Sequence, residues 1–420
     1  MTHLTRNNLL SKKQFGFMSG RSTTLQLLQV LDEWTEAIDQ GNGIEAVYMD
    51  FQKAFNSVPH RRLIHKLTQY GIGGQLLAWL TDFLNNRSQK VRINNNLSSV
   101  SNVKSGIPQG SVSGPVLFII YINDLPDNII SQIFLFADDT KIYKISNPLN
   151  QSEEIDYIQQ DLNNLQKWSD KWLLKFHPDK CKRLFISRHA PDPRMTPLTL
   201  TPQGGNQTRI NDSLEEKDLG ITIDHKIKFD LHITNITKKA SRNMGIIRRS
   251  FQCLNPSVFN PLYKSLVRST LEYGQSIWSP YLISDIRRLE NVQRHATRQV
   301  NNFKGLTYQE RLRKLNLPTL RFRRLRGDMI ELYKINSGLY DPAVTPSFTK
   351  ATRVSRGHSQ KLFQERGRLD IRKYNFRNRS VAPWNCLPEK VVSAPSLNSF
   401  KNRLDNHWKD HPMKFDPLIE

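Results

Sequence analysis

The chain has 420 residues, 38% of them hydrophobic, and its 61 Lys and Arg against 38 Asp and Glu give a formal net charge of +23. These totals exclude a disordered tail, allow two or three packed units, and favour a polyanionic partner such as nucleic acid, although a basic surface alone would carry the same charge. The longest apolar run is too short to span a bilayer, the N-terminus lacks a secretory signal core, and three isolated cysteines indicate no zinc site, so we expect an intracellular protein.

Apolar residues at helical or alternating spacing predict the elements of the first part of the chain. In chain order we expect a helix over 22–40, a strand over 44–51, helices over 60–70 and 74–86, a strand pair from 89–94 and 98–106, a helix over about 114–124 and a hairpin over 131–145.

The rest of the chain shifts from mixed structure to basic helices. We expect a helix over 152–175, strands over 181–187 and 217–224, and helices over 232–251 and 285–300. Residues 301–420 carry 24 basic and 11 acidic side chains, so the positive charge is densest there. The pattern predicts a mixed α/β body to about residue 230, a basic helical region, and a basic C-terminal part from about 301.

Three aspartates lie where predicted strands end. Asp50 follows "AVYM", and Asp138 and Asp139 follow "IFLFA". Adjacent carboxylates resist joint ionisation unless a cation holds them, and Mg²⁺ prefers such oxygen ligands together with substrate phosphates. Two ions at one site can stabilise the attacking and leaving oxygens of a phosphoryl displacement. Ordinary turn chemistry would also explain an Asp-Asp pair, so the motif needs supporting context.

The segments around these aspartates supply that context. Phe55 stands five residues after Asp50, in "DFQKAF", and "SGIPQGSVSGPVLF" (105–118) lies between the two acidic sites. Gly106 and Gly110 allow close backbone approach to a bound base or sugar, and Gln109 can hydrogen-bond. An Asp-x4-Phe, Pro-Gln-Gly and Phe-Ala-Asp-Asp series in this order is very improbable by accident.

The series resembles reverse transcriptases, and more closely the non-LTR (LINE-type) retrotransposon polymerases of the jockey-like group. The blocks that carry the resemblance are "QFGFMSGRST" (14–23), "AVYMDFQKAFNSVPH" (46–60), "SGIPQGSVSGPVLFIIYINDLP" (105–126), "FADDTKIY" (136–143), "WLLKFHPDKCK" (172–182) and "KDLGITID" (217–224). Similar stretches in the last third extend the resemblance over nearly the whole chain.

The resemblance implies an α+β fold with four parts. These are partial fingers over 1–45, a polymerase palm of antiparallel sheet backed by helices over 46–230, a helical thumb over 231–300 and a basic C-terminal region over 301–420. It implies RNA-directed DNA polymerase activity with two Mg²⁺ ions, or Mn²⁺ in their place. The expected partners are an RNA template, a DNA primer or target and dNTPs, without membrane or zinc, in the nucleus and cytoplasm.

The resemblance also assigns roles to single residues. Asp50 and Asp138 would be the principal metal ligands, with Asp139 as the third acid. Phe55 would be the steric gate against a ribose 2′-hydroxyl, unless it is an ordinary core residue. Gln109 and Gly110 would lie at the nascent base pair, and Leu219 and Gly220 would form the primer grip. Lys180 would be the acid that protonates the leaving pyrophosphate, unless it is a solvated turn residue.

The chain also departs from the family pattern. Asn56 replaces a usual aspartate, and the chain begins at the "QFGF" block, so we expect a 5′-truncated element that lacks upstream finger residues and an endonuclease. One interpretation is an active polymerase. The alternative is a relic that binds RNA or RNA–DNA hybrid without polymerising. An RNA-dependent RNA polymerase fits less well, because those enzymes resemble Gly-Asp-Asp at the hairpin and lack a bulky gate.

Overall fold

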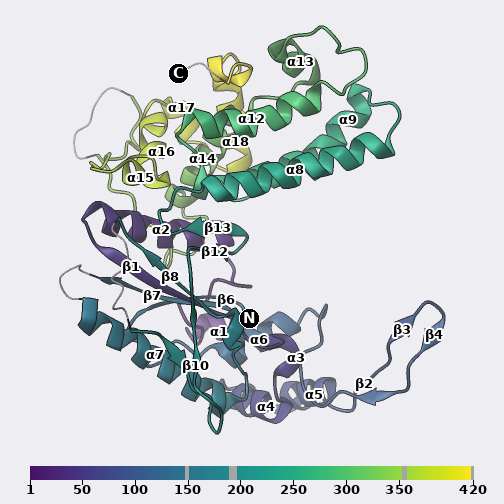
Figure 1. Cartoon of the computed structure of the whole chain (residues 1–420), viewed down its shortest axis with the longest axis vertical. Helices are drawn as coiled ribbons and strands as arrows, with labels where there is room; N and C mark the ends of the chain where they lie inside the picture. The colour runs from purple at the N-terminus through teal and green to yellow at the C-terminus, as the bar shows by residue number, and fades with distance from the viewer. Residues whose placement is uncertain (147–150, 189–195, 352–356, 418–420) are drawn as a thin grey trace. The chain divides into compact units, whose positions relative to one another are not determined.

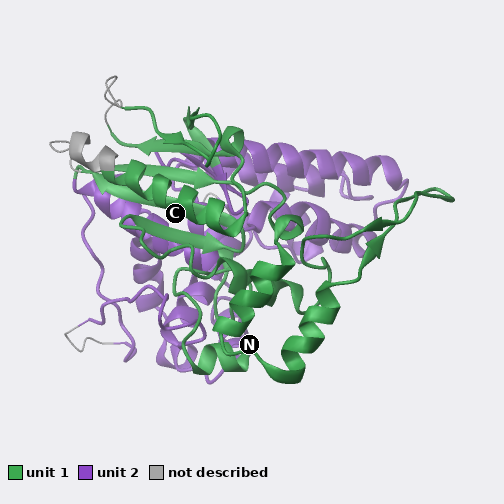
Figure 2. Cartoon of the chain, turned by 90° about the horizontal axis from the view of Figure 1, so that it is seen from below, with its two compact units in different colours: residues 1–23, 41–216 green, residues 24–40, 217–420 purple. Residues whose placement is uncertain are grey.

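The structure is a computed structural model that describes residues 1–146, 151–188, 196–351 and 357–417. The chain forms two compact units, which Figure 2 colours separately. The first unit contains residues 1–23 and 41–216, and the second contains residues 24–40 and 217–420. The chain therefore contributes one early helix to the second unit before it builds the rest of the first.

A five-stranded sheet organises the first unit (Figure 1), with strand order β11-β8-β1-β7-β6. The strands are β1 (Gly43–Met49), β6 (Gln132–Phe136), β7 (Asp139–Ser146), β8 (Lys182–Ile186) and β11 (Asn211–Ser213). The central strand β1 pairs antiparallel with both β7 and β8, whereas β11 runs parallel to β8. Residues on both faces of β1 are buried, which explains why its sequence shows no polar-apolar alternation.

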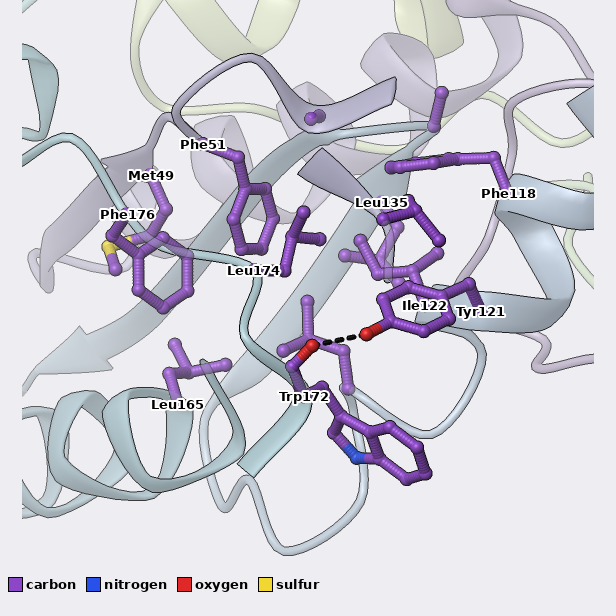
Figure 3. Close-up of a cluster of buried hydrophobic side chains, with 14 of the residues drawn as sticks. Met49, Phe51, Phe118, Tyr121, Ile122, Leu135, Leu165, Trp172, Leu174 and Phe176 are labelled. Atoms are coloured by element: carbon purple, nitrogen blue, oxygen red, sulfur yellow. Dashed lines mark hydrogen bonds between the residues drawn. The ribbon is translucent and has the colours of Figure 1, made fainter. Parts of the chain in front are cut away.

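Helices cover one face of this sheet and form the main core of the unit. They are α1 (Thr2–Arg6), α3 (Ala54–Ser57), α4 (His60–Gln69), α5 (Gly74–Leu84), α6 (Gly114–Ile122) and α7 (Gln151–Trp172). Apolar side chains of α4, α6 and α7 pack with Val47, Leu135 and Ile142 of the strands. Figure 3 shows part of this core, in which the Tyr121 hydroxyl donates to the carbonyl of Trp172.

A buried lysine joins three of these helices. Lys66 of α4 donates to the carbonyl of Tyr121, and its Nζ lies 2.5 Å from Asp124 Oδ1 and 3.8 Å from the centre of the Trp172 ring. Burial lowers the pKa of Lys66 to about 8, although Asp124 opposes that shift. The aromatic ring and the carboxylate together compensate much of the cost of burying an ammonium group.

A long hairpin extends from the first unit after α5 (Figure 1). It consists of β2 (Ser88–Gln89), β3 (Arg92–Ile93), β4 (Asn96–Leu97) and β5 (Ser101–Asn102), with β3 paired to β4 and β2 paired to β5. Its strand residues are all exposed. The unit is completed by the short pair β9 (Thr199–Leu200) and β10 (Thr208–Arg209).

Apart from the pair β12 (Glu215–Asp218) and β13 (Ile221–Asp224), the second unit is mainly helical, and the boundary between the units falls within β12, after Glu216. Its helices are α2 (Thr23–Asp39), α8 (Asp230–Ser250), α9 (Pro256–Leu262), the π-helical η2 (Tyr263–Arg268), α10 (Ser269–Glu272), α11 (Gln275–Trp278), α12 (Ile283–Thr297), α13 (Tyr308–Leu315), α14 (Leu320–Asn336), α15 (Asp370–Lys373), α16 (Phe376–Asn385), α17 (Glu389–Val392) and α18 (Leu397–His407). The N-terminus of α13 is closed by a capping box between Thr307 and Glu310.

Helix α2 joins the second unit through charged contacts with the C-terminal region. Asp32 pairs with Arg372 at 2.6 Å and with Arg377 at 2.9 Å. At the end of the helix, the Asp39 carboxylate accepts the backbone N–H groups of Arg368 and Leu369. These contacts explain why residues 24–40 group with the C-terminal half rather than with the rest of the predicted segment 1–45.

The mixed helix-and-sheet fold predicted from the sequence is confirmed, and most predicted elements occur at their expected positions. The segment 217–224 differs, because a turn at Leu219 and Gly220 divides it into the end of β12 and the whole of β13. The predicted pair in 89–106 forms as two short strand pairs of one hairpin. Among the described residues, no helix is both long and apolar enough to cross a membrane.

Candidate active site

Asp50 is positioned by the end of the central strand. It follows Met49, the last residue of β1, and its carbonyl accepts the N–H of His177 at 2.8 Å. The neighbouring Phe51 stacks on Phe176 with ring centres 4.4 Å apart. A short antiparallel contact with the segment after α7 therefore holds Asp50 in place.

Asp138 and Asp139 lie at the reversal between β6 and β7. Ala137 and Asp138 form the turn, while Asp139 begins β7 opposite Phe136. Strand β7 also pairs with β1, and Thr140 lies opposite Met49. The register thus brings the ends of two sequence-distant segments together, with Asp50 next to the aspartate turn.

The electrostatics of the site follow from this proximity. Burial raises the pKa of Asp138, and the negative charge of Asp50 raises it further, against the effect of a backbone hydrogen bond. Lys180 Nζ lies 3.6 Å from Asp50 Oδ1, and both side chains are about half exposed. Lys180 belongs to the short 3-10 helix η1 (Pro178–Lys180), so the predicted acid lies next to the predicted metal ligand.

Asp50 and Asp138 provide a suitable pair of oxygen ligands for a divalent cation. Their mutual repulsion would be relieved by a bound positive charge, and hard cations are commonly held by two carboxylates completed by substrate oxygens and water. In the described parts of the chain, no three His, Cys, Asp or Glu side chains converge closely enough to hold a metal on their own. The assignments of Asp50, Asp138 and Asp139 as metal ligands stay predictions.

The loop 105–110 packs against the segment that follows Asp50 and contains Phe55, because the N–H of Ile107 donates to the Phe55 carbonyl at 2.8 Å. The Phe55 ring is half-buried and stacks on Phe118 of α6 with centres 4.3 Å apart. Gln109 Nε2 donates to Asn56 Oδ1 at 3.2 Å, and the side chains of Gln109 and the residue Gly110 are exposed. Asn56, the departure from the family pattern, thus contacts the predicted nucleotide-binding loop directly.

Gly106 is required for this loop to approach so closely. It has φ +97°, and a Cβ at this position would lie 2.8 Å from the carbonyl oxygen of Asn56. Its N–H donates to the Val58 carbonyl at 2.8 Å. The loop is therefore fixed against the segment carrying Phe55, whereas Gly110, with φ +81°, has open space around it.

Leu219 and Gly220 belong to the second unit. Both have positive φ, of 46° and 89°, and the Tyr273 hydroxyl donates to the Leu219 carbonyl at 2.8 Å. A Cβ on Gly220 would lie 3.0 Å from the Tyr273 ring. These contacts define a tight β12–β13 turn, and its assignment to a primer grip stays a prediction.

Two further residues lie at the site that the sequence did not single out. Gln14 is completely buried and contacts the turn at Ala137, and its place in the "QFGF" block was the only available signal. Cys181 is buried beside Asp50, and burial raises the pKa of its thiol to about 11, so the thiol stays neutral. An isolated cysteine in a sequence gives no such indication.

Comparison with known proteins identifies the family. Residues 1–229 match the family described as "Reverse transcriptase (RNA-dependent DNA polymerase)". The chain is 28% identical over 340 residues to "Probable RNA-directed DNA polymerase from transposon BS" of Drosophila melanogaster, covering 76% of this chain and 35% of that protein. It is also 28% identical over 306 residues to "RNA-directed DNA polymerase from mobile element jockey" of Drosophila melanogaster, covering 70% of this chain and 32% of that protein.

The chain spans about one third of the length of these relatives. Among solved structures it is similar to "Structure of apo telomerase from Candida Tropicalis", with a TM-score of 0.42, 8% identity, and coverage of 75% of this chain and 52% of that chain. The family match covers more than half of the chain and contains the aspartates and the loop described above. The chain therefore belongs to the reverse transcriptase (RNA-dependent DNA polymerase) family, as its resemblance to jockey-like non-LTR members predicted.

Proposed function

We propose that this chain is the polymerase part of a non-LTR retrotransposon protein and adds dNTPs to the 3′-hydroxyl of a primer on an RNA template. The observation that carries the proposal is the convergence of Asp50 and Asp138 beside Lys180, at the end of the central strand. Two carboxylates next to an exposed ammonium can bind cations and accommodate the charges of a triphosphate substrate.

Asp50 and Asp138, with Asp139 adjacent, would hold two Mg²⁺ ions, or Mn²⁺ in their place. When bound, the metal ions would neutralise phosphate charge and favour ionisation of the attacking hydroxyl. Lys180 is exposed and not tightly paired with Asp50, so its ammonium can reach the leaving pyrophosphate and give it a proton. Phe55 would limit the space beside the sugar, and Gln109 and Gly110 would contact the new base pair.

The parts of the fold take the corresponding polymerase roles in this proposal. The sheet of the first unit would be the palm, residues 1–45 part of the fingers, and residues 231–300 the thumb. Leu219 and Gly220 would form the primer grip, and residues 301–420 would add a basic region. We place the protein in the nucleus and cytoplasm, where an RNA template and a DNA target are found.

Surface features of the first unit support a nucleic-acid partner. Trp79 is 55% exposed and stacks on Phe83 with ring centres 5.5 Å apart, and Arg87 lies 5.4 Å from the Phe83 ring centre. The hairpin that follows carries Lys90 and Arg92, and no acidic residue occurs in 83–123. Exposed aromatic rings next to cations are suited to stacking bases and attracting phosphates.

The experiment is primer extension by the purified chain with a primed RNA template, dNTPs and Mg²⁺. The wild type should extend the primer, and Asp138→Asn should lower the rate by ~10³-fold or more, because a cation-binding carboxylate is lost. Asp410→Asn, at an exposed position of the second unit, should retain full activity. A wild type that binds RNA–DNA hybrid in a salt-sensitive manner but does not extend the primer would replace the polymerase proposal with the binding-only alternative.

A further inference from the structure

The segment before α2 runs along the sheet edge next to the aspartate turn. The N–H of Phe15 donates to the Leu135 carbonyl at 2.7 Å, and the N–H of Leu135 donates to the Lys13 carbonyl at 2.9 Å. Gln14 lies between these bonds in parallel contact with Leu135 of β6. The "QFGF" block therefore continues the sheet beyond β6, and its backbone is fixed relative to the turn.

The side chain of Gln14 binds the backbone of Ala137 at both polar groups. Its Oε1 accepts the N–H of Ala137 at 2.9 Å and the N–H of Gly16 at 2.7 Å, and its Nε2 is 3.4 Å from the Ala137 carbonyl oxygen, to which it donates. Because two N–H donors face the same atom, that atom must be the amide oxygen. Gln14 has no exposed surface, so water does not compete for these bonds.

Ala137 needs such support because its backbone is in an unfavourable conformation. It has φ +56°, in the left-handed region that costs a non-glycine residue about 1 kcal/mol or more. Asp138 follows directly, so the direction of its carboxylate depends on how this turn is held. Gly16 allows the approach, because a Cβ at that position would lie 2.3 Å from the Ala137 nitrogen.

We infer that Gln14 is a positioning residue that holds the Ala137–Asp138 turn in its left-handed conformation and thereby directs the Asp138 carboxylate toward Asp50. The catalytic consequence of this inference rests on the proposed function, whereas the hydrogen bonds between Gln14 and Ala137 do not depend on it. A buried glutamine that only satisfies its own hydrogen bonds would affect stability alone. A positioning residue also affects the rate of the chemical step, because it orients another residue that takes part in the reaction.

The test compares Gln14→Met with Gln166→Met. Both changes remove a buried amide from the first unit. The hydrogen bond of Gln166 stays within α7, where its Nε2 donates to Asp170 Oδ1 at 3.0 Å. Gln14→Met should lower kcat for primer extension by ~10- to 100-fold with little change in KM for dNTP, since misorientation by about 1 Å has that effect. Gln166→Met should keep the wild-type kcat. Equal kcat values for Gln14→Met and the wild type would overturn the inference.

Ala137→Gly provides a rescue that a purely structural role would not show. Glycine adopts positive φ without strain, so the kcat of Gln14→Met/Ala137→Gly should be several-fold higher than that of Gln14→Met. If Gln14→Met does not fold, amide hydrogen exchange at position 137 is compared between the double variant and Ala137→Gly alone. Exchange should be faster in the double variant, because only Ala137→Gly keeps the Gln14 oxygen that accepts this N–H. Equal exchange rates in that comparison would overturn the inference.

Backbone amide hydrogen exchange separates this inference from the proposed function. The Ala137 N–H should exchange much faster in Gln14→Met than in the wild type, while the paired amides of β7 remain protected. An unchanged Ala137 exchange rate would overturn the inference even for an active enzyme. If the wild type is inactive but the Ala137 N–H still exchanges faster in Gln14→Met than in the wild type, the proposed function is contradicted and the contact between Gln14 and Ala137 remains established.

Discussion

Phe55 can be an ordinary core residue or a selectivity determinant, and its contacts allow a test between them. Its ring stacks on Phe118 with ring centres 4.3 Å apart and is only partly buried, unlike the fully buried Phe118. The stacked contact fixes the orientation of the ring, and its accessible part would exclude a 2′-hydroxyl if Phe55 is the predicted steric gate.

We predict that Phe55→Ala lowers discrimination between dNTPs and rNTPs by ~10-fold or more, because the excluded space beside the sugar becomes accessible. The measurement is the ratio of kcat/KM for the two substrates in primer extension. Ile64→Ala, another half-buried apolar residue that packs on the same core, should leave that ratio unchanged while reducing stability. If Phe55→Ala reduces stability and keeps the wild-type ratio, Phe55 is a core residue only.

At the scale of elements, sequence periodicity predicted most of what the structure shows. Helices α2, α8 and α12 and the β6–β7 hairpin occur where apolar spacing placed them. The strand predicted over 217–224 was divided, because periodicity does not register the tertiary bond from Tyr273 to the Leu219 carbonyl. The motif pattern also predicted Asp50 and Asp138 as site residues. It did not predict Gln14, because Gln14 contacts a residue 123 positions away and spacing within a motif does not reveal such a contact.

Helix α8 illustrates how packing changes the chemistry of a residue. His232, near its start, accepts the N–H of Thr222 from β13 at Nδ1, at 3.2 Å, and its ring centre lies 5.2 Å from that of Trp278 in α11. Burial lowers the pKa of His232 to about 4 from 6.5. A neutral imidazole therefore joins the strand to two helices, and protonation would place a charge in an apolar contact.

This shift predicts acid sensitivity of the second unit. Above pH 6.5 the imidazole is neutral in both the folded and the unfolded states, so it has no effect. Between pH 6.5 and about 4 the unfolded state binds a proton that the folded state excludes, so the free energy of unfolding falls as pH falls, by up to ~3 kcal/mol.

Urea unfolding followed by circular dichroism at pH 7 and pH 4.5 measures the effect. His232→Asn places an acceptor near the position of Nδ1 without a titrating group, so its stability should fall less over this interval than that of the wild type. His295→Asn, at an exposed site on α12, should retain the wild-type dependence. The same pH dependence in the wild type and in His232→Asn would refute the prediction.

At the scale of the whole molecule, part of the basic charge of the C-terminal region is engaged in ion pairs within the protein. The sequence alone assigned this excess to a polyanionic partner, but several of its arginines form internal ion pairs. Arg323 pairs with Glu272, Arg326 with Asp405, Arg379 with Asp328, and Arg372 and Arg377 with Asp32. These paired arginines stabilise the fold and add little to the charge that could attract a nucleic acid. One sequence could not reveal these pairs, because Asp32 and its partners are 340 residues or more apart.

The Asp32 pairs predict that an early helix depends on the last part of the chain. Asp32→Asn would leave the Arg372 guanidinium, which is only 5% exposed, with Glu365 as its near partner, and would leave Arg377 with Glu365 at 3.7 Å. Loss of one member of a buried ion pair costs several kcal/mol, so we expect the free energy of unfolding of the second unit to fall by about 3 kcal/mol. Urea unfolding of the full chain measures this change.

Glu36→Gln is the matched control, because Glu36 is an exposed acid on the same helix and lies 3.7 Å from Arg372. Its loss should change stability by no more than ~0.5 kcal/mol, as is usual for exposed pairs. In a double-mutant cycle, Asp32→Asn and Arg377→Gln together should cost less than the sum of the single changes, since each removes the same ion pair. Additive costs, or an Asp32→Asn variant as stable as Glu36→Gln, would show that α2 is held by apolar packing rather than by its charged contacts with the C-terminal region.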